Sequence, residues 1–435
     1  MNKLIGKTIS ALFLTVLAVA PVCAEFDETE QRMLEWIDGN AEDANALLEE
    51  TVNISSGTMN HEGVKAVGDV MRRELDALGL ETEWISMPPE VNRAGHLFGR
   101  KGGKGKKVLM IGHLDTVFES DDAFQSYERN GNIAKGPGVD DMKSGNVIII
   151  YALKALQEVG ALDDLPIVVA YTGDEEKAGQ PLSISRRDLV AAGEWADISL
   201  GFESAVHYDD VDWATTSRRS SSSWTLTTTG RQAHSSGVFS ERTGAGAVYE
   251  ISRILTRFYA ELRDEEFLTF NAANIQGGTD VTYDEQLNRG SSFGKTNIVP
   301  RSAVAHGDIR AISNEQLARV RDRMLAIVSE SLPHTSASIE FLDKYPPMSP
   351  TDGNQALADR LSAINEELGR GPMSILHPLR RGAADISFVA PYSDSLAGLG
   401  ALGSGGHSPN ESLDLTTMSL AIKRAAILIY RLNQP

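Results

Sequence analysis

Three consecutive carboxylates follow directly on a strongly apolar run in the middle of this chain. The run from Leu165 to Tyr171 is typical of a fully buried strand, and Thr172-Gly173 then leads into Asp174-Glu175-Glu176. In open α/β sheets, ligands gather at the carboxyl ends of strands. Three adjacent acids repel one another unless a cation holds them, and the simpler alternative is a solvated acidic turn. The rest of the chain decides between these two interpretations.

The segments around this turn repeat the arrangement of a buried strand followed by a polar loop. Val108 to Ile111 predicts a strand that leads into Gly112-His113-Leu114-Asp115, and Ile198 to Phe202 predicts another that leads into Glu203. Between them, Gly136 to Gly145 opens a helix with an apolar face. Strands and helices that alternate in this way predict a doubly wound α/β layer.

The pattern changes near Ser217. From there the expected elements follow the order strand, helix, strand, strand, helix, strand, at residues 220–229, 245–262, 267–275, 298–309, 314–331 and 338–342. This order is typical of a ferredoxin-like α+β domain. We therefore predict an α/β fold, residues 25–216 and 344–435, that is interrupted by an inserted ferredoxin-like domain, residues 217–343.

Residues 1–24 are typical of a secretory signal peptide. Lys3 and Lys7 precede an apolar stretch, residues 9–20, that is too short to span a membrane, and Val22-Cys23-Ala24 ends it with a small residue. We expect cleavage after Ala24 and a periplasmic or secreted protein. A lipoprotein anchored through Cys23 is the alternative, which the bulky Val22 disfavours.

The cysteine content bears on disulfides, and the net charge bears on the classes of partner. The chain has 60 acidic and 41 basic residues, a formal net charge of −19, and its single cysteine lies in the predicted signal peptide. The mature chain would therefore have no disulfide. Such acidity disfavours nucleic acid and anionic membrane surfaces as partners, so we predict neither.

Five side chains that could bind a metal follow predicted strands or glycine-rich segments: His113, Asp141, Glu176, Glu203 and His407. Taken alone, a histidine at the end of a strand is more often an ordinary buried side chain. Together, imidazoles and carboxylates without a thiol suit zinc, cobalt or manganese, and zinc is common in hydrolytic sites. Because two histidines and three carboxylates exceed the needs of one catalytic zinc, we predict two metal ions that share a carboxylate.

In sequence order, these residues resemble the motifs of the co-catalytic dinuclear zinc exopeptidase and amidohydrolase family. That family includes glutamate carboxypeptidase, aminoacylase and succinyl-diaminopimelate desuccinylase. The matching segments are His113 to Val117, Gly136 to Gly145, Asp174 to Glu176 and the final His407. The resemblance covers nearly the whole mature chain, and the inserted domain falls where the family has its lid and dimerisation domain. It implies that residues 25–216 and 344–435 form a three-layer α/β catalytic domain with a mixed sheet. Gly173 to Gly179 resembles the glutamate carboxypeptidase branch most.

The resemblance implies two Zn²⁺ ions per chain, with Co²⁺ or Mn²⁺ as alternatives. His113 and Glu203 would hold one ion, Glu176 and His407 would hold the other, and Asp141 would bridge them.

Within the same motifs, Asp140 is the alternative bridge. We prefer Asp141 because it lies two residues before Lys143 of the motif, and we expect Asp140 to cap the loop. The resemblance also implies that Asp115 orients His113.

The implied reaction is hydrolysis of the amide bond to a C-terminal amino acid. Two metal ions lower the pKa of a shared water, so that hydroxide forms near neutral pH. Glu175 would act as the general base that takes the proton of this water and passes it to the leaving amine, whereas Asp174 is expected to be structural. The substrate would be a small peptide or an N-acyl amino acid, with glutamate as a candidate C-terminal residue.

The inserted domain contains three residues that resemble substrate-binding positions of the family: His234, Asn297 and Arg310. The resemblance implies that His234 stabilises the oxyanion in the site of a neighbouring subunit, which requires a homodimer through the inserted domain. The alternative is a surface histidine in a monomer. Asn297 and Arg310 would bind the free carboxylate of the substrate, a bidentate task that suits a guanidinium.

One loop departs from the family pattern. The Gly-Gly-Thr-Asp segment of relatives appears here as Arg381-Gly382-Ala383-Ala384-Asp385. Asp385 matches, but the threonine is missing, so we do not expect this loop to make the threonine's contacts with the substrate. Arg380 or Arg381 would replace an arginine found nearby in relatives. Arg218-Arg219, near the domain junction, either bind an acidic group or form a solvated hinge.

Two other functions compete with a carboxypeptidase. The first is an N-acyl amino acid deacylase that uses the same site, and the second is a catalytically silent binding protein with the same fold. The complete set of ligands together with Glu175 argues against the second.

Overall fold

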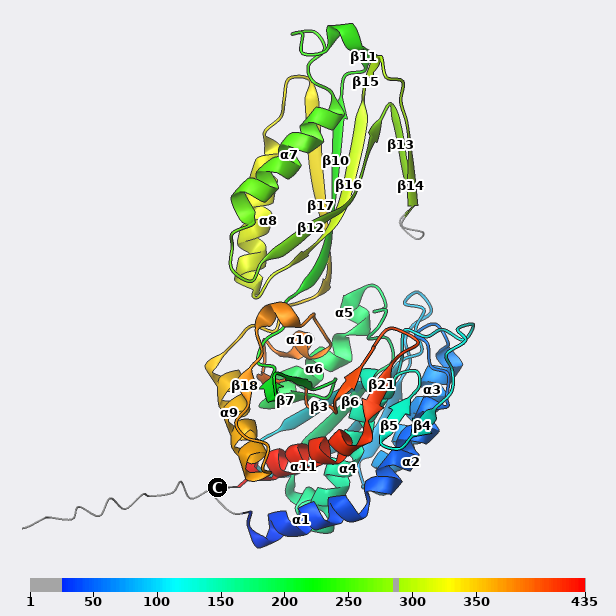
Figure 1. Ribbon diagram of the computed structural model, residues 1–435, viewed down its shortest axis with the longest axis vertical. Helices are drawn as coiled ribbons and strands as arrows, with labels where there is room; N and C mark the ends of the chain where they lie inside the picture. The colour runs from blue at the N-terminus through cyan, green and yellow to red at the C-terminus, as the bar shows by residue number, and fades with distance from the viewer. Residues whose placement is uncertain (1–25, 285–288, 435) are drawn as a thin grey trace, which may run out of the picture.

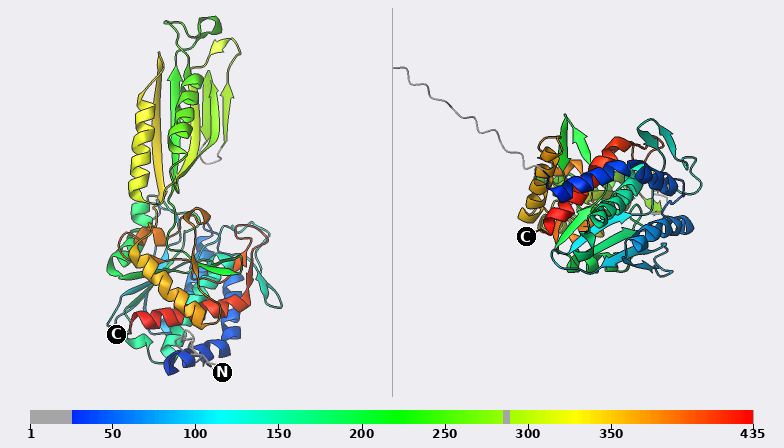
Figure 2. Two further views of the ribbon diagram at one scale, coloured as in Figure 1. Left: turned by 60° about the vertical axis from the view of Figure 1, so that its left-hand side comes forward. Right: turned by 90° about the horizontal axis from the view of Figure 1, so that it is seen from below.

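The computed structural model describes residues 26–284 and 289–434 of the 435-residue chain. These residues form two bodies that follow one another along the long axis of the molecule (Figures 1 and 2). One is an α/β body made from both ends of the chain, and the other is an inserted body. The predicted signal peptide, residues 1–24, lies outside the described residues. Among the helices of the described part, none combines the length and the apolar character that crossing a membrane requires.

A six-stranded sheet forms the centre of the α/β body, with the strands in the order β1-β2-β6-β3-β7-β19. The strands are β1 (Glu81–Ile85), β2 (His96–Lys101), β3 (Val108–His113), β6 (Ile167–Thr172), β7 (Ile198–Gly201) and β19 (Asp394–Leu396). β3 runs parallel to both β6 and β7, and β19 runs parallel to β7. β1 and β2 are antiparallel to their neighbours, so the sheet is mixed.

Helices cover both faces of this sheet. Side chains alternate along β3, so that Val108 and Met110 enter one hydrophobic cluster whereas Leu109 and Ile111 enter another. The first cluster includes residues of α1 (Glu28–Gly39), α2 (Ala41–Val52), α3 (His61–Ala77), α4 (Ser144–Glu158), α9 (Asp352–Glu367) and α11 (Leu415–Leu432). The second includes residues of α6 (Arg187–Trp195) and α10 (Ile386–Val389). The α/β body is therefore built in three layers.

The inserted body consists of a four-stranded antiparallel sheet with two helices on one face (Figure 1). In chain order its elements are β10 (Ser221–Gly230), α7 (Ala247–Leu262), β12 (Thr269–Gly278), β16 (Ser302–Arg310), α8 (Asn314–Ser329) and β17 (Thr335–Tyr345), and the strand order is β12-β16-β10-β17. Buried and partly exposed residues alternate along β10, because one face packs on the helices. Two short pairs, β11 (Ala233–His234) with β15 (Ile298–Val299) and β13 (Asp280–Asp284) with β14 (Arg289–Phe293), are added to this core.

Two small sheets form within the loops of the α/β body. The first has the strand order β18-β9-β8, and the second has the order β20-β21-β5-β4. Their strands are β4 (Glu128–Asn130), β5 (Ile133–Lys135), β8 (Val206–Tyr208), β9 (Val211–Ala214), β18 (Ser374–Ile375), β20 (Gly403–Ser404) and β21 (Ser412–Asp414), and a short helix, α5 (Leu182–Ser185), precedes α6. The antiparallel pair β20 and β21 encloses residues 405–411, the loop that contains His407.

Candidate metal centre

The loops that contain the predicted site residues leave the central sheet at one edge. His113 is the last residue of β3 and pairs with Thr172, the last residue of β6, while β7 on the other side of β3 ends at Gly201. Parallel strands that end together place the loops after them side by side, so the three loops form one common site.

Four of the five predicted metal ligands meet at this edge. Candidate ligand atoms of His113, Asp141 and Glu176 lie within 4.8 Å of one another. Nε2 of His113 is 3.2 Å from Oδ1 of Asp141. Nε2 of His407 is 3.3 Å from Oδ2 of Asp141 and 3.1 Å from Oε2 of Glu176. The two oxygens of Asp141 therefore face different histidines, which is the arrangement that a bridging carboxylate requires.

A residue that the sequence did not single out positions two of these loops. The carboxylate of Glu411 accepts hydrogen bonds from the backbone N–H groups of Gly138 at 3.1 Å, Asp140 at 2.8 Å and Asp141 at 2.9 Å. Glu411 is 1% exposed and ends the loop that contains His407. It thus joins the turn of Asp141 to the loop of His407. Its carboxylate, not that of Asp140, supplies the cap of the Asp141 turn.

The electrostatics of the cluster favour bound cations. Hydrogen bonds to Asp141 and Glu176 raise the pKa of His407 to about 10. Burial lowers the pKa of His113, but its bonds to Asp115 and Asp141 outweigh burial and hold that pKa well above its ordinary value. The carboxylates that face both histidines therefore favour positive charge at this place. Metal ions would supply the same positive charge at the same place.

The donor atoms fit divalent metal ions. Oε1 of Glu176 is buried and has no hydrogen-bond partner among the described residues, although buried polar atoms nearly always have one. Burial raises the pKa of Glu176 to about 7, so the neighbouring positive groups do not fully stabilise its negative charge. A coordinated cation would provide it. Imidazole nitrogens and carboxylate oxygens are donors that zinc, cobalt and manganese accept.

Glu203, the fifth predicted ligand, lies beside His113. It follows β7 and lines a small cavity together with His113, Met142 and Arg218. Its Oε2 accepts a hydrogen bond from Nη2 of Arg218, whose residue is only 2% exposed. The structure therefore brings Glu203 to the same small cavity as His113 and pairs it with a buried guanidinium. Arg218 is not part of a solvated hinge, which was one of its two interpretations.

Asp115 connects His113 to the acidic turn. It is fully buried, and its Oδ1 lies 3.4 Å from Nδ1 of His113, whose Nδ1 also lies 3.0 Å from the Asp115 carbonyl oxygen. The two carboxylate oxygens accept the backbone N–H groups of Glu175 at 3.0 Å and Glu176 at 3.1 Å. Thr58 donates its hydroxyl to Oδ2 at 2.6 Å. One carboxylate thus fixes the orientation of the imidazole and the position of both glutamates.

Glu175 lies among the acidic groups of the site. Burial raises the pKa of its carboxyl well above the ordinary value, the nearby His113 lowers it, and the negative charges of Glu203 and Asp385 add to the increase. Its backbone carbonyl accepts a hydrogen bond from the hydroxyl of Tyr345 at 2.6 Å. A carboxyl whose proton affinity is increased in this way is suited to proton transfer near neutral pH.

Asp174 has a structural environment. It is fully buried, and its Oδ1 forms an ion pair with Nη1 of Arg186 at 2.5 Å, while its Oδ2 accepts the N–H of Gly179 at 2.8 Å. Nε of Arg186 pairs with Asp385 at 2.8 Å. The buried Arg186 therefore joins the acidic turn to the 381–385 loop, which the sequence did not indicate because the two lie about 200 residues apart.

The three predicted substrate-binding residues lie in two different places. His234 on β11 and Asn297 just before β15 are exposed neighbours, and Ser235 N–H bonds to the Asn297 carbonyl at 2.9 Å. β11 and β15 lie at the end of the inserted body that points away from the α/β body (Figure 1). Within one chain, the structure therefore does not bring His234 and Asn297 to the metal ligands.

Arg310, by contrast, ends β16 at the junction of the two bodies. Its Nη1 lies 3.5 Å from the position that a Cβ on Gly382 would occupy, and its Nε donates to Asp308 at 3.0 Å. The 381–385 loop therefore lies beside Arg310. In the same loop, burial and the charge of Arg218 lower the pKa of Arg381 to about 10, so several guanidinium groups face this side of the site.

Comparison with known proteins places the chain in a family. The sequence model of peptidase family M20/M25/M40 matches residues 109–431. Carboxypeptidase G2 from Pseudomonas sp. (strain RS-16) is 28% identical over 395 residues, which cover 89% of this chain and 88% of the relative. Succinyl-diaminopimelate desuccinylase from Methylocella silvestris is 26% identical over 341 residues, which cover 74% of this chain and 81% of that protein.

Solved structures share the fold. Aminopeptidase PepT from Bacillus cereus has a TM-score of 0.66 at 16% sequence identity and covers 93% of this chain and 99% of its own. A dinuclear metal-binding peptidase of the M20 family from Bacillus subtilis has a TM-score of 0.61 at 14% identity and covers 91% of this chain and 99% of its own. The match of the family model confirms the family that the motifs predict. The chain therefore belongs to peptidase family M20/M25/M40 and is a metal-dependent hydrolase of peptide bonds.

Proposed function

We propose that this protein is a carboxypeptidase that removes a C-terminal amino acid from a small peptide or an N-acyl amino acid. The observation that carries the proposal is the environment of Glu175. Glu175 has a carboxyl with a raised pKa and is held by Asp115 beside the metal ligands, and a guanidinium, Arg310, lies at the junction of the two bodies. Together these groups offer proton transfer and recognition of a carboxylate.

In this proposal, the site holds two zinc ions. His113 and Glu203 would hold one ion, Glu176 and His407 would hold the other, and Asp141 would be shared by both. Oδ1 of Asp141 faces His113, and its Oδ2 faces His407. This arrangement supports the proposed assignment of one histidine to each ion. When bound, such ions lower the pKa of a water molecule and polarise a carbonyl oxygen.

The remaining steps belong to residues of the chain. Glu175 accepts a proton from the attacking water and later donates it to the leaving amine, because an amide nitrogen leaves poorly until it is protonated. Asp115 keeps Glu175 in place through its backbone N–H and keeps His113 in one orientation. Asp115 is thus a positioning residue, and Glu175 exchanges the proton.

Arg310 binds the free carboxylate of the substrate in this proposal. A planar guanidinium can donate two parallel hydrogen bonds to a carboxylate. The side chain of Arg310 remains 36% exposed and therefore accessible. A preference for a C-terminal glutamate is supported by the resemblance of Gly173 to Gly179 to the glutamate carboxypeptidase branch.

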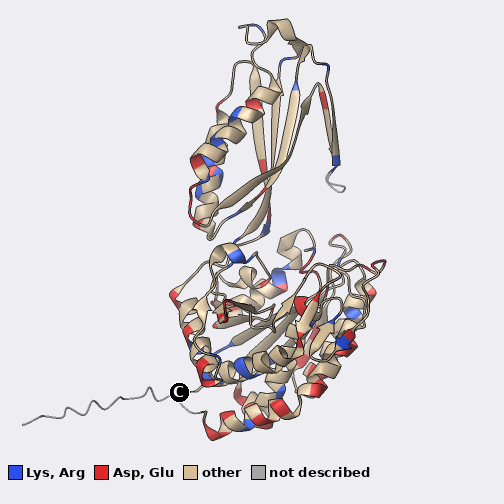
Figure 3. Ribbon diagram, viewed as in Figure 1, with Lys and Arg blue, Asp and Glu red and all other residues tan. Residues whose placement is uncertain are grey.

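We further propose that His234 and Asn297 act in the site of a second subunit. Both are exposed on the inserted body, remote from the metal ligands of their own chain, so a homodimer through this body would give them a substrate to bind. The proposed setting is the periplasm or the medium after export. Acidic residues gather on α1 and α2 (Figure 3), and the net charge of −19 supports small molecules over nucleic acid or anionic membranes as partners.

A substrate pair that differs only at the carboxylate tests this function. N-acyl glutamate should be hydrolysed with a kcat/KM about 100-fold or more above that of the same compound with its α-carboxylate converted to an amide, because the amide cannot accept the charge-assisted bonds of Arg310. Arg310→Met should reduce this ratio by lowering the rate for the acid alone. Equal rates for acid and amide would contradict a carboxypeptidase. A panel of N-acyl groups on one amino acid distinguishes a deacylase from a peptidase.

A further inference from the structure

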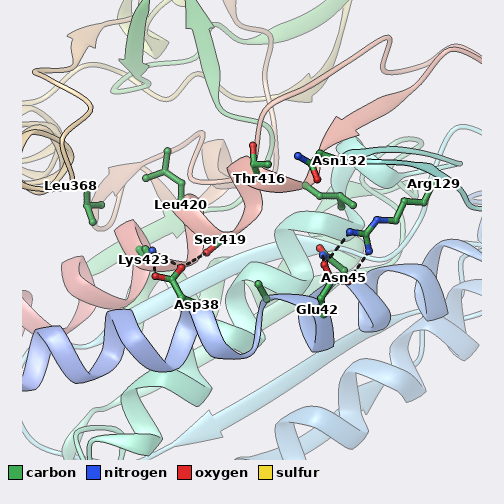
Figure 4. A pocket seen from close by; sticks show the side chains of 12 residues that line it. Asp38, Glu42, Asn45, Arg129, Asn132, Leu368, Thr416, Ser419, Leu420 and Lys423 are labelled. Atoms are coloured by element: carbon green, nitrogen blue, oxygen red, sulfur yellow. Dashed lines mark hydrogen bonds and ion pairs between the residues drawn. The ribbon is translucent and has the colours of Figure 1, made fainter.

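Charged side chains line a cleft of about 390 Å³ between α1, α2 and the first turns of α11 (Figure 4). They pair with one another: Nζ of Lys423 lies 2.7 Å from Oδ2 of Asp38, and the guanidinium of Arg129 donates to both oxygens of Glu42 at 2.7 and 3.0 Å. Since these charges are satisfied within the chain, their arrangement points to no ligand. A contact between the inserted body and the acidic turn, residues 174–176, bears instead on the reaction.

Tyr345 is the residue at which the chain leaves the inserted body. It ends β17 and pairs with Ser221, the first residue of β10, so the two strands that connect the bodies meet here (Figure 1). Residues 342–344 before it are exposed, whereas Tyr345 is partly buried. Its ring centroid lies 5.2 Å from that of Phe388 and 5.9 Å from the guanidinium carbon of Arg186. The side chain of Tyr345 therefore packs on the α/β body, although its backbone ends the inserted one.

The hydroxyl of Tyr345 is bound on two sides. It accepts a hydrogen bond from Nη2 of Arg186 at 3.1 Å and donates one to the backbone carbonyl of Glu175 at 2.6 Å. These roles are fixed, because a guanidinium can only donate and a carbonyl oxygen can only accept. Burial raises the pKa of Tyr345 well above its ordinary value, and the charge of Glu175 adds to the increase. The hydroxyl therefore keeps the proton that it donates.

Arg186 is a rigid partner for this hydroxyl. It is 1% exposed, and its Nη1 and Nε form ion pairs with Asp174 at 2.5 Å and with Asp385 at 2.8 Å. Its Nη2 also donates to the carbonyl oxygen of Asp174 at 3.1 Å. Because charge-assisted bonds hold the guanidinium on two edges, it fixes the place of the Tyr345 oxygen.

The backbone of Glu175 is thus held from both sides. Oδ1 of Asp115 accepts its N–H at 3.0 Å, and the hydroxyl of Tyr345 donates to its carbonyl at 2.6 Å. We infer that Tyr345 is a positioning residue for proton transfer by Glu175, and that it holds the catalytic turn from the last strand of the inserted body. The inference rests on the role proposed for Glu175. A displacement of about 1 Å can cost a reaction about 100-fold in rate, so this anchor should affect turnover.

Tyr345→Phe tests the inference, because it removes the hydroxyl and keeps the ring against Phe388 and Arg186. With N-acyl glutamate as substrate, kcat should fall about fivefold or more, since the carboxyl of Glu175 is no longer held in one place. KM should stay within about twofold, because Arg310 and the proposed metal ligands are unchanged.

Tyr171→Phe is the matched control. Tyr171 is fully buried, and its hydroxyl donates to the backbone carbonyl of Asn146 at 3.1 Å. The control therefore loses the same kind of buried bond without touching the backbone of Glu175. Its kcat should stay within about twofold of that of the unmodified protein, even if its thermal stability falls.

Amide hydrogen exchange provides a readout that does not depend on turnover. In the full-length Tyr345→Phe protein, the N–H groups of Glu175 and Glu176 should exchange about fivefold faster or more, because the turn has lost one anchor, whereas Tyr171→Phe should leave their exchange unchanged. A kcat lowered less than about fivefold, an increase in KM in place of the loss of kcat, or unchanged exchange at these two positions would each overturn the inference and leave the proposed function intact. Absence of hydrolysis by the unmodified protein would overturn the proposed function and the inference with it.

Discussion

Replacing Glu175 by glutamine is expected to lower kcat about 1,000-fold or more while the protein keeps its full complement of metal. Proton transfer by a positioned side chain contributes about 10²–10⁴ to a rate, and glutamine has the same shape but cannot accept the proton. The hydrogen bond from the Glu175 backbone to Asp115 at 3.0 Å is unaffected by the change, so the turn should stay in place. None of the proposed metal ligands is altered.

The measurement combines hydrolysis of an N-acyl amino acid with elemental analysis of the purified variant. Glu194→Gln on α6, which makes the same chemical change at an exposed position, is the control and should behave as the unmodified protein. A kcat within tenfold of normal in the Glu175→Gln protein would show that another group carries the proton.

Asp141→Asn is expected to remove the metals themselves. Each oxygen of Asp141 faces one histidine, so the loss of its negative charge weakens both positions together. Changes in groups that only support ligands lower metal affinity about 10–100-fold, and the loss of a shared ligand should cost about 100-fold or more. At zinc concentrations that saturate the unmodified protein, Asp141→Asn should contain fewer than two ions per chain and hydrolyse no substrate.

Asp140→Asn is the matched control, since it makes the same change one residue earlier and leaves the N–H groups that bind Glu411 intact. It should keep both ions. The reverse result, with metal lost from Asp140→Asn and kept by Asp141→Asn, would assign the bridge to Asp140.

Most of the site could be predicted from the sequence, because the site residues directly follow apolar strands. β3 and β6 are buried along their whole length, and such runs can be recognised without a structure. His113 and the acidic turn then lie at the ends of neighbouring parallel strands, as expected for ligands of an α/β sheet. The family motifs supplied the order of the remaining ligands.

The sequence did not show which strands are neighbours in the sheet. The Lys/Gly-rich run from Arg100 to Lys107 suggests a hairpin, but β2 and β3 are not neighbours, because β6 lies between them in the sheet. A local pattern shows that the chain turns, and it does not show which strand pairs with which.

The supporting residues were missed for a similar reason. Glu411 binds backbone groups about 270 residues earlier in the chain, and Arg186 joins Asp174 to Asp385 about 200 residues later. An acid or an arginine in a loop gives no local signal of such a distant partner. These contacts depend on how the loops pack, and only the folded chain brings them together.

The most direct measurement is a zinc titration of the metal-free protein, followed by the rate of hydrolysis of N-acyl glutamate. A dinuclear site predicts no hydrolysis without metal and a rate that reaches its maximum at two equivalents of zinc per chain. Hydrolysis that persists in the metal-free protein, or a maximum at one equivalent, would contradict a reaction that depends on His113, Asp141, Glu176, Glu203 and His407 together.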